Sequence, residues 1–444
     1  MAFVLIPHLN PSHESMMVNL LSKCTTMPVI EAKQGMAVEP NSLYVIPPNY
    51  FLAIRHRNLQ LSNSPSDLGG QTSIDFFLRS LAEDQAQRAI GIVLSGTGSH
   101  GSLGARQIKT SGGMVMAQRP DTAEYDQMPL NAIKTGIVDF VLPPEQMPEA
   151  LISYWTRSSV GTDVERLEQA EGSSEVIDQI FGILQKQEHY DFRVYRKPMV
   201  LRRIQRRMGI VGVDSLPTYL LFLQNRPDEA TALFKDLLIN VTAFFRDPEA
   251  YQFIEKEVLP ALIATHDRDL PIRVWIAGCS TGEEAYSLAI VLREAISNAK
   301  SSLVIQLFAS DIDIDALEIA RTGVYPASIA ADVSAERLEK FFIKPDDEHY
   351  QINKDIRDSV VFSHQNLIGD PPFSKLDLIS CRNLLIYFEP EVQKNVISLF
   401  HFALTAGGTL FLGPSETIGR RSDLFETISK KWRVYRRSDT AKRN

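Results

Sequence analysis

The chain has 444 residues, and its 46 Lys and Arg against 54 Asp and Glu give a formal net charge of −8 at pH 7. Its 44% hydrophobic and 23% charged residues are typical of globular proteins. The length predicts two or three domains. The acidic balance argues against a nucleic-acid-binding protein, which would have a basic face. No apolar run approaches the roughly 18 residues of a membrane-spanning helix, so no membrane insertion is expected.

The cysteines and the N-terminus bear on the compartment and on metal binding. Cys24, Cys279 and Cys381 share no metal-site spacing and no disulfide pattern, so no metal site is expected. A reducing compartment suits three isolated thiols. The first ten residues, MAFVLIPHLN, lack the basic flank and the cleavage site of a signal peptide. We therefore expect a cytoplasmic protein.

Residues 1–150 alternate apolar runs with helical patterns. Extended segments are expected at residues 2–6, 42–46, 51–55 and 89–94, and helices at 15–23, 73–87 and 102–110. A glycine-rich turn, SGTGSHG, follows the last of these strands. This alternation predicts a parallel α/β domain.

Residues 151–174 are polar and contain Ser and Gly, which indicates a linker. From residue 175 to 262 the apolar residues fall at helical spacing, which predicts a small all-α domain. Arg202, Arg203, Arg206 and Arg207 place four positive charges within two helical turns. Such a cluster is most simply a solvated helix face, but in an acidic chain it also suits an acidic partner.

Residues 263–444 contain three apolar strands, at 274–277, 303–310 and 375–380, and each ends in polar residues. The first runs into the turn GCSTG and then a helix, the second ends at Asp311, and the third ends at Arg382 and Asn383. Such strands predict a doubly wound, Rossmann-like domain whose ligand lies at the carboxyl ends of the strands. The turn does not match the dinucleotide fingerprint G-x-G-x-x-G. An acid at the second strand tip is where a nucleotide ribose is usually held.

Two structural roles compete with this interpretation. Ser280 and Glu283 match a capping box, which would make Glu283 a helix-start residue. Asp311 matches an N-cap for a helix over residues 315–321. Together, however, the spacing of the polar strand tips favours a nucleotide-like cofactor.

Residues 175–437 resemble the CheR family of chemotaxis receptor methyltransferases. The matching words, in order, are RRIQRRM (202–208), INVTAFFRDP (239–248), AGCSTGEEAYSLAI (277–290), ASDIDIDALEIAR (309–321), DPPFSKLDLISCRNLLIY (370–387) and FLGPSETIG (411–419). The resemblance implies a protein-glutamate O-methyltransferase that uses S-adenosyl-L-methionine.

The resemblance also implies roles for individual residues. Cofactor contacts are expected from Asn240, Thr242, Arg246, Glu284 or Glu283, Asp311, Asn366, Leu367, Arg382 and Asn383. Arg246 and Tyr387 are candidates for positions near the transferred methyl group. Contacts to the receptor's glutamate-bearing helices are expected from Arg193, Arg196, Arg202, Arg203, Arg206 and Arg207.

Residues 1–150 resemble the catalytic domain of the CheB methylesterases, in the words HLNPSHES (8–15), LYVIPPN (43–49), LSGTGSHGSLG (94–104), GGMVMAQ (112–118) and MPLNAIKTGIVDFVLPP (128–144). That family uses a Ser-His-Asp triad, and His8 matches its histidine. The loop with the nucleophilic serine has no counterpart in the sequence, and His100 stands at the aspartate's position. We therefore expect a truncated, inactive domain with a vestigial site. A bifunctional esterase and methyltransferase, or a scaffold without turnover, are the alternatives.

The resemblance further implies a small β subdomain inserted near residues 325–362, with a turn at Lys354 and Asp355 and a last strand at 359–362. Some family members bind a receptor's C-terminal peptide there. The loop at 343–350 lacks the glycines associated with those members, so we predict no dependence on such a peptide. Calorimetric titration with a receptor tail peptide tests this prediction, and tight binding would contradict it.

Overall fold

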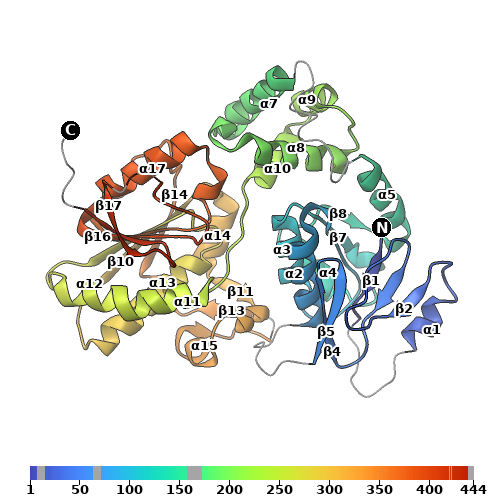
Figure 1. Ribbon diagram of the computed structural model, residues 1–444, viewed down its shortest axis with the longest axis horizontal. Helices are drawn as coiled ribbons and strands as arrows, with labels where there is room; N and C mark the ends of the chain where they lie inside the picture. Colours follow the sequence, from blue (N-terminus) through green and yellow to red (C-terminus); the bar gives the residue numbers. More distant parts are fainter. Residues whose placement is uncertain are drawn as a thin grey trace. The chain divides into compact units, whose positions relative to one another are not determined.

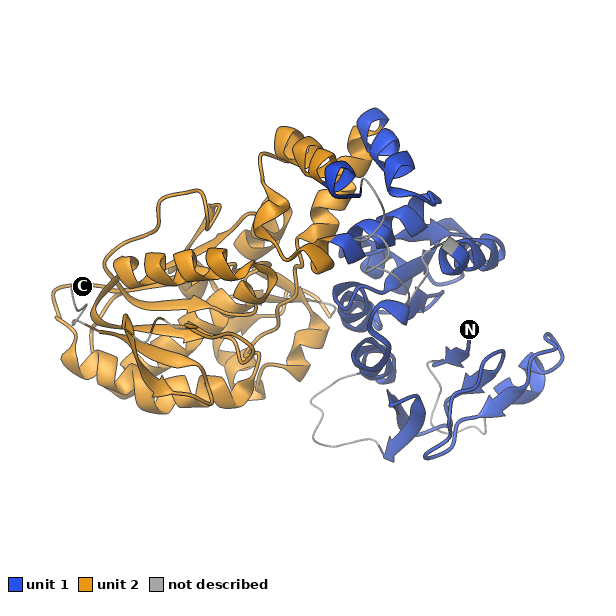
Figure 2. Ribbon diagram, turned by 45° about the horizontal axis from the view of Figure 1, so that its top comes forward, with its two compact units in different colours: residues 1–177, 201–225 blue, residues 178–200, 226–444 orange. Residues whose placement is uncertain are grey.

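The computed structural model describes residues 1–7, 16–63, 72–157, 173–347, 349–419, 421 and 423–438. It divides into two compact units, residues 1–177 with 201–225 and residues 178–200 with 226–444 (Figure 2). Each unit has its own hydrophobic core. Among the described residues, no helix is both long and apolar enough to cross a membrane.

The first unit contains two three-stranded parallel sheets and one antiparallel hairpin (Figure 1). The strands are β1 (Phe3–Leu5), β2 (Val29–Glu31), β3 (Leu43–Val45), β4 (Tyr50–Arg55), β5 (Asn58–Asn63), β6 (Ile90–Val93), β7 (Met114–Gln118) and β8 (Phe140–Leu142). The sheet orders are β1-β3-β2 and β6-β7-β8, and β4 pairs with β5. The predicted parallel α/β architecture is confirmed. Strands β2, β5, β7 and β8 were not among the expected segments; β2 and β8 are three residues long and β5 is polar.

The helices of this α/β region are α1 (Met17–Leu21), α2 (Ser73–Gln85), α3 (Ser102–Thr110), α4 (Gln127–Lys134) and α5 (Met147–Arg157). The buried carboxylate of Asp75 on α2 accepts hydrogen bonds from the amides of Gly101 (3.1 Å) and Gly104 (2.8 Å) at the start of α3. Residues 151–157, the start of the segment expected to be a helical or flexible linker, form the second half of α5. Residues 158–172 lie outside the described residues.

An all-α segment follows, as predicted. Its helices are α7 (Ser173–Glu188), α8 (Lys197–Val211), α9 (Leu216–Asn225) and α10 (Pro227–Leu237). Proline at the first position of α10 suits a helix start, where its missing N–H has no intrahelical partner to lose. Helix α8 contributes residues to both units, which divide between Val200 and Leu201.

The second unit is built on a seven-stranded sheet with the order β14-β10-β9-β15-β16-β18-β17. Its strands are β9 (Ile272–Ala277), β10 (Ile305–Asp311), β14 (Val360–His364), β15 (Leu376–Cys381), β16 (Leu404–Leu412), β17 (Phe425–Ser429) and β18 (Val434–Arg437). The first five strands in that order pair in parallel, and β18 and β17 close the edge in antiparallel pairing. The predicted doubly wound sheet with antiparallel closing strands is confirmed.

The helices of the second unit are α11 (Pro248–Phe253), α12 (Leu259–Thr265), α13 (Glu283–Asn298), α14 (Ile314–Thr322), α15 (Ala335–Phe341), α16 (Lys354–Arg357) and α17 (Pro390–Ala403).

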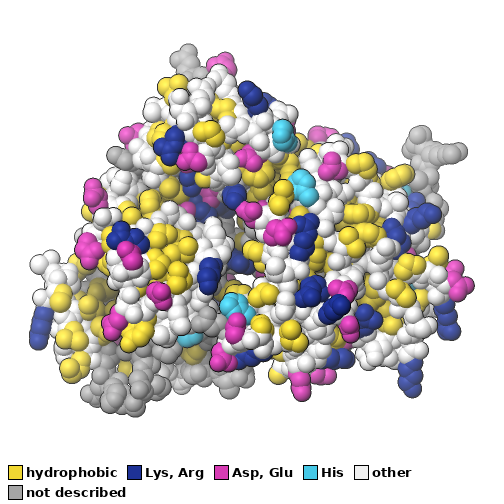
Figure 3. Space-filling model, turned by 180° about the vertical axis from the view of Figure 1, so that it is seen from behind, with side chains coloured by type: hydrophobic (Ala, Val, Ile, Leu, Met, Phe, Trp, Pro, Cys, Tyr) yellow, Lys and Arg dark blue, Asp and Glu magenta, His cyan; other side chains and the backbone are white. Residues whose placement is uncertain are grey.

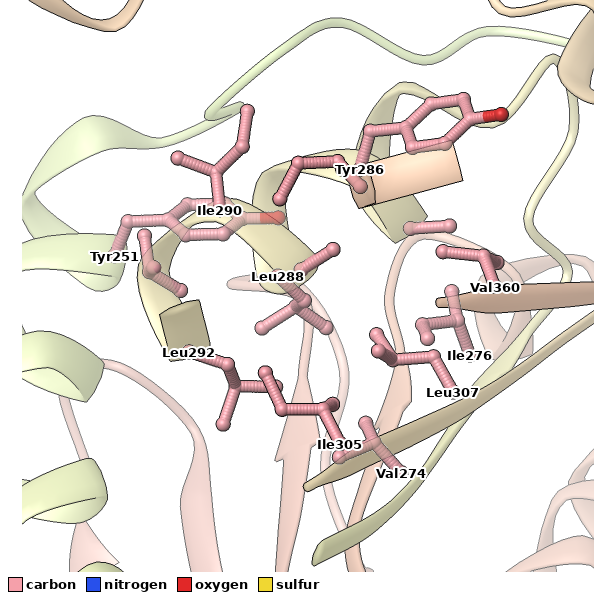
Figure 4. Close-up of a cluster of buried hydrophobic side chains, with 14 of the residues drawn as sticks. Tyr251, Val274, Ile276, Tyr286, Leu288, Ile290, Leu292, Ile305, Leu307 and Val360 are labelled. Atoms are coloured by element: carbon pink, nitrogen blue, oxygen red, sulfur yellow. The ribbon is translucent and has the colours of Figure 1, made fainter. Parts of the chain in front are cut away.

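Successive side chains of β9 point to opposite faces of this sheet, and each face packs against a helix. Val274 and Ile276 belong to the core cluster that also contains Leu288 and Leu292 of α13 (Figure 4). Between them, Trp275 points to the other face, where its ring lies 5.6 Å from that of Phe400 on α17. These side chains are fully buried, and burying each contributes about 1.5–3 kcal/mol to stability.

A small antiparallel sheet of order β11-β13-β12 is inserted in this unit, with β11 (Val324–Pro326), β12 (Phe342–Ile343) and β13 (His349–Ile352). Two expected details of the insertion differ in the structure. The extended segment expected at residues 359–362 is present, but as part of β14 of the main sheet, where Val360 aligns with Leu307 of β10. The turn expected at Lys354 and Asp355 begins α16, because the Asn353 side chain caps that helix by accepting from the Ile356 amide (3.1 Å).

Candidate functional site

A cavity lies at the carboxyl ends of β9, β10 and β15, entirely within the second unit. It is lined by Tyr195, Leu238, Ile239, Asn240, Val241, Thr242, Arg246, Gly278, Ser280, Glu284, Asp311, Ile312, Arg382, Asn383, Leu384 and Tyr387. The predicted convergence of three polar strand tips is therefore observed. The loop between α10 and α11 and the turn η7 (Leu385–Tyr387) complete the lining.

The turn after β9 requires glycine at two of its positions. Gly278 has a φ of +76°, and a Cβ there would lie 2.7 Å from Cδ2 of Leu384. Gly282, the N-cap of α13, has a φ of +93°, and a Cβ there would lie 2.8 Å from Cβ of Ala320. Glycine alone tolerates both the backbone conformation and the space. These two residues allow the turn to approach its neighbours closely, and Gly278 lines the cavity.

The capping box considered for this turn is wrong. The N-cap of α13 is Gly282, and no side chain in the described part of the chain caps this helix. Ser280 Oγ instead donates to Asn240 Oδ1 (3.5 Å), and Glu283 accepts from Thr281 Oγ1 (2.6 Å). Glu283 is buried and does not line the cavity, whereas Glu284 does. Of these two acids, therefore, Glu284 is the one that lines the cavity.

Asp311 is not a helix cap either. The N-cap of α14 is Asp313, whose Oδ1 accepts from the amides of Asp315 (2.9 Å) and Ala316 (3.2 Å). The Asp311 carboxylate lies at the tip of β10 and accepts from the amides of Ser280 (2.7 Å) and Asp313 (2.9 Å). Burial raises the pKa of Asp311, and these amide hydrogen bonds oppose the shift. The backbone thus holds an acceptor group in the cavity wall.

Arg382 is the main cation of the cavity, and its side chain is buried. Its Nη2 donates to Asp247 Oδ2 (2.6 Å) and to the Arg246 carbonyl (2.9 Å), and its Nη1 lies 3.7 Å from Glu284 Oε2. Glu284 Oε1 in turn accepts from Ser380 Oγ (2.6 Å). Arg382 Nε and Nη1 have no hydrogen-bond partner among the residues that the structure describes, and neither does Asn383 Oδ1. Buried groups of this kind normally have a partner, which a bound polar ligand can provide.

The loop from residue 238 to 247 forms one wall of the cavity. Asn240 donates from Nδ2 to Asp313, and Arg246 Nη1 donates to the Val241 carbonyl (3.0 Å). Phe245 has a φ of +49°, and its amide donates to Ser287 Oγ of α13 (2.9 Å). A left-handed conformation at a bulky residue is strained and persists only where contacts enforce it. The wall is thus held firmly against α13.

Asn366 and Leu367 follow β14 but are not among the residues that line the cavity. The side chain of Asn366 accepts from the amides of Ile368 (3.0 Å) and Gly369 (3.3 Å), so it stabilises its own turn. The Gln365 amide donates to the Asp311 carbonyl (2.9 Å), which keeps this turn beside the β10 tip. Their contact with a cofactor remains a prediction.

Glu416 and Tyr195 were not predicted. Each Glu416 oxygen accepts two backbone hydrogen bonds: Oε1 from Leu384 (2.8 Å) and Leu385 (2.7 Å), and Oε2 from Asn383 (2.9 Å) and Gly413 (2.7 Å). Burial raises the pKa of Glu416, and the four amides oppose that shift. An acid in the word FLGPSETIG was the only sequence signal for Glu416.

Tyr195 lines the cavity and lies on a segment bridged to Phe388. Its hydroxyl lies 3.4 Å from that of Tyr190, and burial raises the pKa of Tyr195. The hydroxyl therefore stays protonated and can donate a hydrogen bond.

In the first unit, His100 lies in the turn before α3, and its ring is 3.7 Å from the position of a Cβ built on Gly98. His8 lies outside the described residues.

Three family models match the chain. "CheR methyltransferase, SAM binding domain" matches residues 240–434, and "CheR methyltransferase, all-alpha domain" matches residues 175–238. The chain belongs to the CheR methyltransferase family. A third model, "CheB methylesterase", matches residues 1–151, so the CheR part follows a CheB-like domain.

The chain is similar to several individual proteins. A chemotaxis protein methyltransferase of Vibrio cholerae is 34% identical over 239 residues, which cover 53% of this chain and 82% of that protein. An uncharacterised 104.1 kDa protein of Rhodobacter capsulatus is 36% identical over 440 residues, which cover 94% of this chain and 46% of that protein. The chain thus spans about half the length of this relative. The catalytic domain of the Thermotoga maritima CheB methylesterase is 28% identical, with a TM-score of 0.31, over 34% of this chain and 81% of that one.

The cofactor of a CheR SAM-binding domain is S-adenosylmethionine. Polar groups of the cavity suit the chemistry of this molecule, because the unpaired donors of Arg382 suit a carboxylate, and the Glu284 carboxylate and Asn383 Oδ1 suit an ammonium group. The amino-acid end of the cofactor carries both groups. Asp311, at the next strand tip, offers an acceptor for ribose hydroxyls.

Glu416→Gln should destabilise the loop at residues 383–385, which borders the cavity. The amide of glutamine replaces one acceptor oxygen by a donor, so two backbone amides of the loop lose their partner. We expect the free energy of unfolding to fall by about 1–3 kcal/mol in urea denaturation. The matched control is Glu426→Gln on β17, where the side chain is exposed. Equal unfolding midpoints for the two variants would contradict the role of Glu416.

Proposed function

We propose that this protein transfers a methyl group from S-adenosylmethionine to the side-chain carboxylate of glutamate residues on chemotaxis-type receptors. Family membership supports the methyl transfer. The observation that carries the proposal is the buried Arg382, whose two unpaired donor nitrogens lie beside Glu284 at the strand ends. Arg382 and Glu284 together suit the end of a ligand that carries both a carboxylate and an ammonium group. In a purely structural role, the buried donors of Arg382 would be expected to have hydrogen-bond partners.

In this proposal, Arg382 binds the cofactor carboxylate, Glu284 and Asn383 bind its ammonium group, and Asp311 binds the ribose hydroxyls. Further contacts with the cofactor are proposed for Asn240, Thr242, Arg246, Asn366 and Leu367. The first three line the same cavity, which supports their assignment.

The methyl-transfer reaction determines what the remaining residues of the cavity must do. The cofactor supplies a methyl group on a sulfonium, whose C–S bond breaks as the carboxylate oxygen forms the new C–O bond, leaving a neutral thioether and a methyl ester. Glutamate is already ionised at neutral pH, so no general base is needed. Charge disappears as the reaction proceeds, so strong pairing of the separate charges would slow it. Arg246 and Tyr387 line the cavity and are proposed to align the incoming carboxylate.

Receptor contacts are proposed for the basic residues of the helical segment, with one correction. Arg203 and Arg206 are only 7% and 4% exposed, so they do not form part of a surface that a receptor can reach in this structure. Arg202 is exposed on α8 and Arg207 is half-buried.

Two other predicted contacts, Arg193 and Arg196, are exposed on the segment before α8. Arg193 pairs with Asp191 (3.1 Å), and Arg196 Nε donates to the Phe388 carbonyl (3.2 Å). Lys and Arg mix with Asp and Glu over the face shown in Figure 3, so charge on that face is interspersed.

The CheB-like domain is proposed to lack esterase activity. His100 replaces the aspartate that would stabilise an imidazolium, and a neutral imidazole supplies no fixed negative charge for that purpose.

Calorimetric titration with S-adenosylhomocysteine tests the cofactor site. Wild-type protein should bind in the micromolar range, roughly −8 kcal/mol. Asp311→Ala removes two acceptor oxygens and should weaken binding by about 1.5–3 kcal/mol, or roughly 10- to 150-fold. Asp315→Ala is the control, because that exposed carboxylate pairs with Lys235 outside the cavity. Folded protein that does not bind would contradict the proposed function.

A further inference from the structure

Two of the four clustered arginines of α8 are engaged inside the first unit. Arg203 and Arg206 are three residues apart and Ile210 follows four residues later, so all three lie on one face of the helix. This face contacts residues 109–154 of the CheB-like domain. Arg202, by contrast, is exposed.

Arg203 binds the carboxyl end of α3. Its Nη1 donates to the Lys109 carbonyl (3.2 Å) and its Nη2 to the Thr110 carbonyl (2.7 Å). Both carbonyls belong to the last turn of α3, where a helix leaves its acceptors without intrahelical donors. A cation at this end also interacts favourably with the helix dipole. Arg203 thus serves as a capping group supplied from α8.

Arg206 reaches a buried carboxylate. Its Nε donates to the Gly113 carbonyl (3.0 Å), and its guanidinium forms an ion pair with Asp139. Asp139 also accepts from the Val115 amide (2.9 Å) and pairs with Lys109 (2.7 Å). The side chains of Arg206 and Asp139 are 3% and 1% exposed. Removing either partner would leave a buried charge without compensation, so the pair holds α8 firmly.

Apolar packing reinforces the contact. Ile210 packs against a buried cluster made of Met114, Met116, Met147, Leu151 and Tyr154. These residues come from β7 and α5 of the CheB-like domain. The α8 face therefore has three anchors, namely a helix cap, a buried ion pair and an apolar side chain.

We propose that the CheB-like domain masks part of the receptor-binding surface of the methyltransferase. The inference rests on the proposed function, in which the arginines of α8 bind acidic receptor helices. Arg203 and Arg206 cannot meet a receptor carboxylate while they bind α3 and Asp139. The CheB-like domain and a glutamate-bearing helix thus compete for the same guanidinium groups.

The chemistry of the contact makes competition feasible. An acidic helix offers Arg206 a carboxylate in exchange for that of Asp139, so the guanidinium is never left without an anion. Two ligands that exclude each other lower each other's affinity by the same factor. Loosening the masked contact should therefore raise the affinity for receptor and leave the cofactor cavity unchanged.

Asp139→Asn tests the masking directly. The substitution keeps the shape of the side chain and removes the charge opposite Arg206. Labelling with phenylglyoxal and mass spectrometry should find Arg202 reactive and Arg203 and Arg206 protected in wild-type protein, with both becoming reactive in the variant. Methylation of a receptor cytoplasmic fragment should show a KM for receptor lower by about fivefold or more, the lower end of typical coupling between sites. The affinity for S-adenosylhomocysteine should not change.

Asp121→Asn is the matched control, since Asp121 is exposed in the same domain and pairs only locally with Arg119 (2.6 Å). Ile210→Gln is a second route to the same state if Asp139→Asn does not fold, because it removes the apolar anchor and keeps every charge. Equal labelling of Arg202, Arg203 and Arg206 in wild-type protein would overturn the inference. The inference would also be overturned if Arg203 and Arg206 became reactive in the variant while the KM for receptor did not fall. Absence of methyl transfer from the wild type and from all variants would instead contradict the proposed function. The labelling comparison alone would then test whether Arg203 and Arg206 are held by the CheB-like domain.

Discussion

The register of the parallel strands β9, β10 and β15 determines where the polar groups of the cavity lie. In the sheet, Val274 of β9 aligns with both Leu307 of β10 and Leu378 of β15, so the three strands reach the same edge together. The residues that follow them therefore meet in one cavity. A shift of one strand by a single residue would turn its side chains to the opposite face and separate these groups. The buried side chains of β9 and α13 exclude such a shift, because they would have to leave the core.

Several site residues could be predicted because strand and turn signals are local. The apolar run at 274–277, the small residues of the turn and the acid at Asp311 are all read from short stretches. The helix-cap roles that competed with this interpretation for Ser280 and Asp311 are not observed. A neighbouring residue, Asp313, provides the cap of α14, and the backbone of Ser280 donates to Asp311. A choice between adjacent polar residues depends on backbone geometry that spacing alone does not reveal.

Other features depend on contacts between distant parts of the chain. Glu416 holds a loop more than 30 residues away, and nothing in its own surroundings predicts four amide donors. Likewise, an arginine cluster on a helix predicts an exposed basic face. Arg203 and Arg206 are buried because carbonyl groups and Asp139, from a different domain, match their donors. Charge patterns indicate what a surface could bind, whereas tertiary contacts determine whether that surface is accessible.

Transfer of labelled methyl groups to a receptor fragment is a direct measure of the proposed methyl transfer to glutamate. Wild-type protein is incubated with S-adenosylmethionine that carries a tritiated methyl group and with a receptor cytoplasmic fragment. We expect label on the fragment that mild alkali releases as methanol, as for a carboxyl methyl ester, and that is lost when the receptor glutamates are replaced by alanine. Label that is stable to alkali, or no label from a protein that binds S-adenosylhomocysteine, would contradict it.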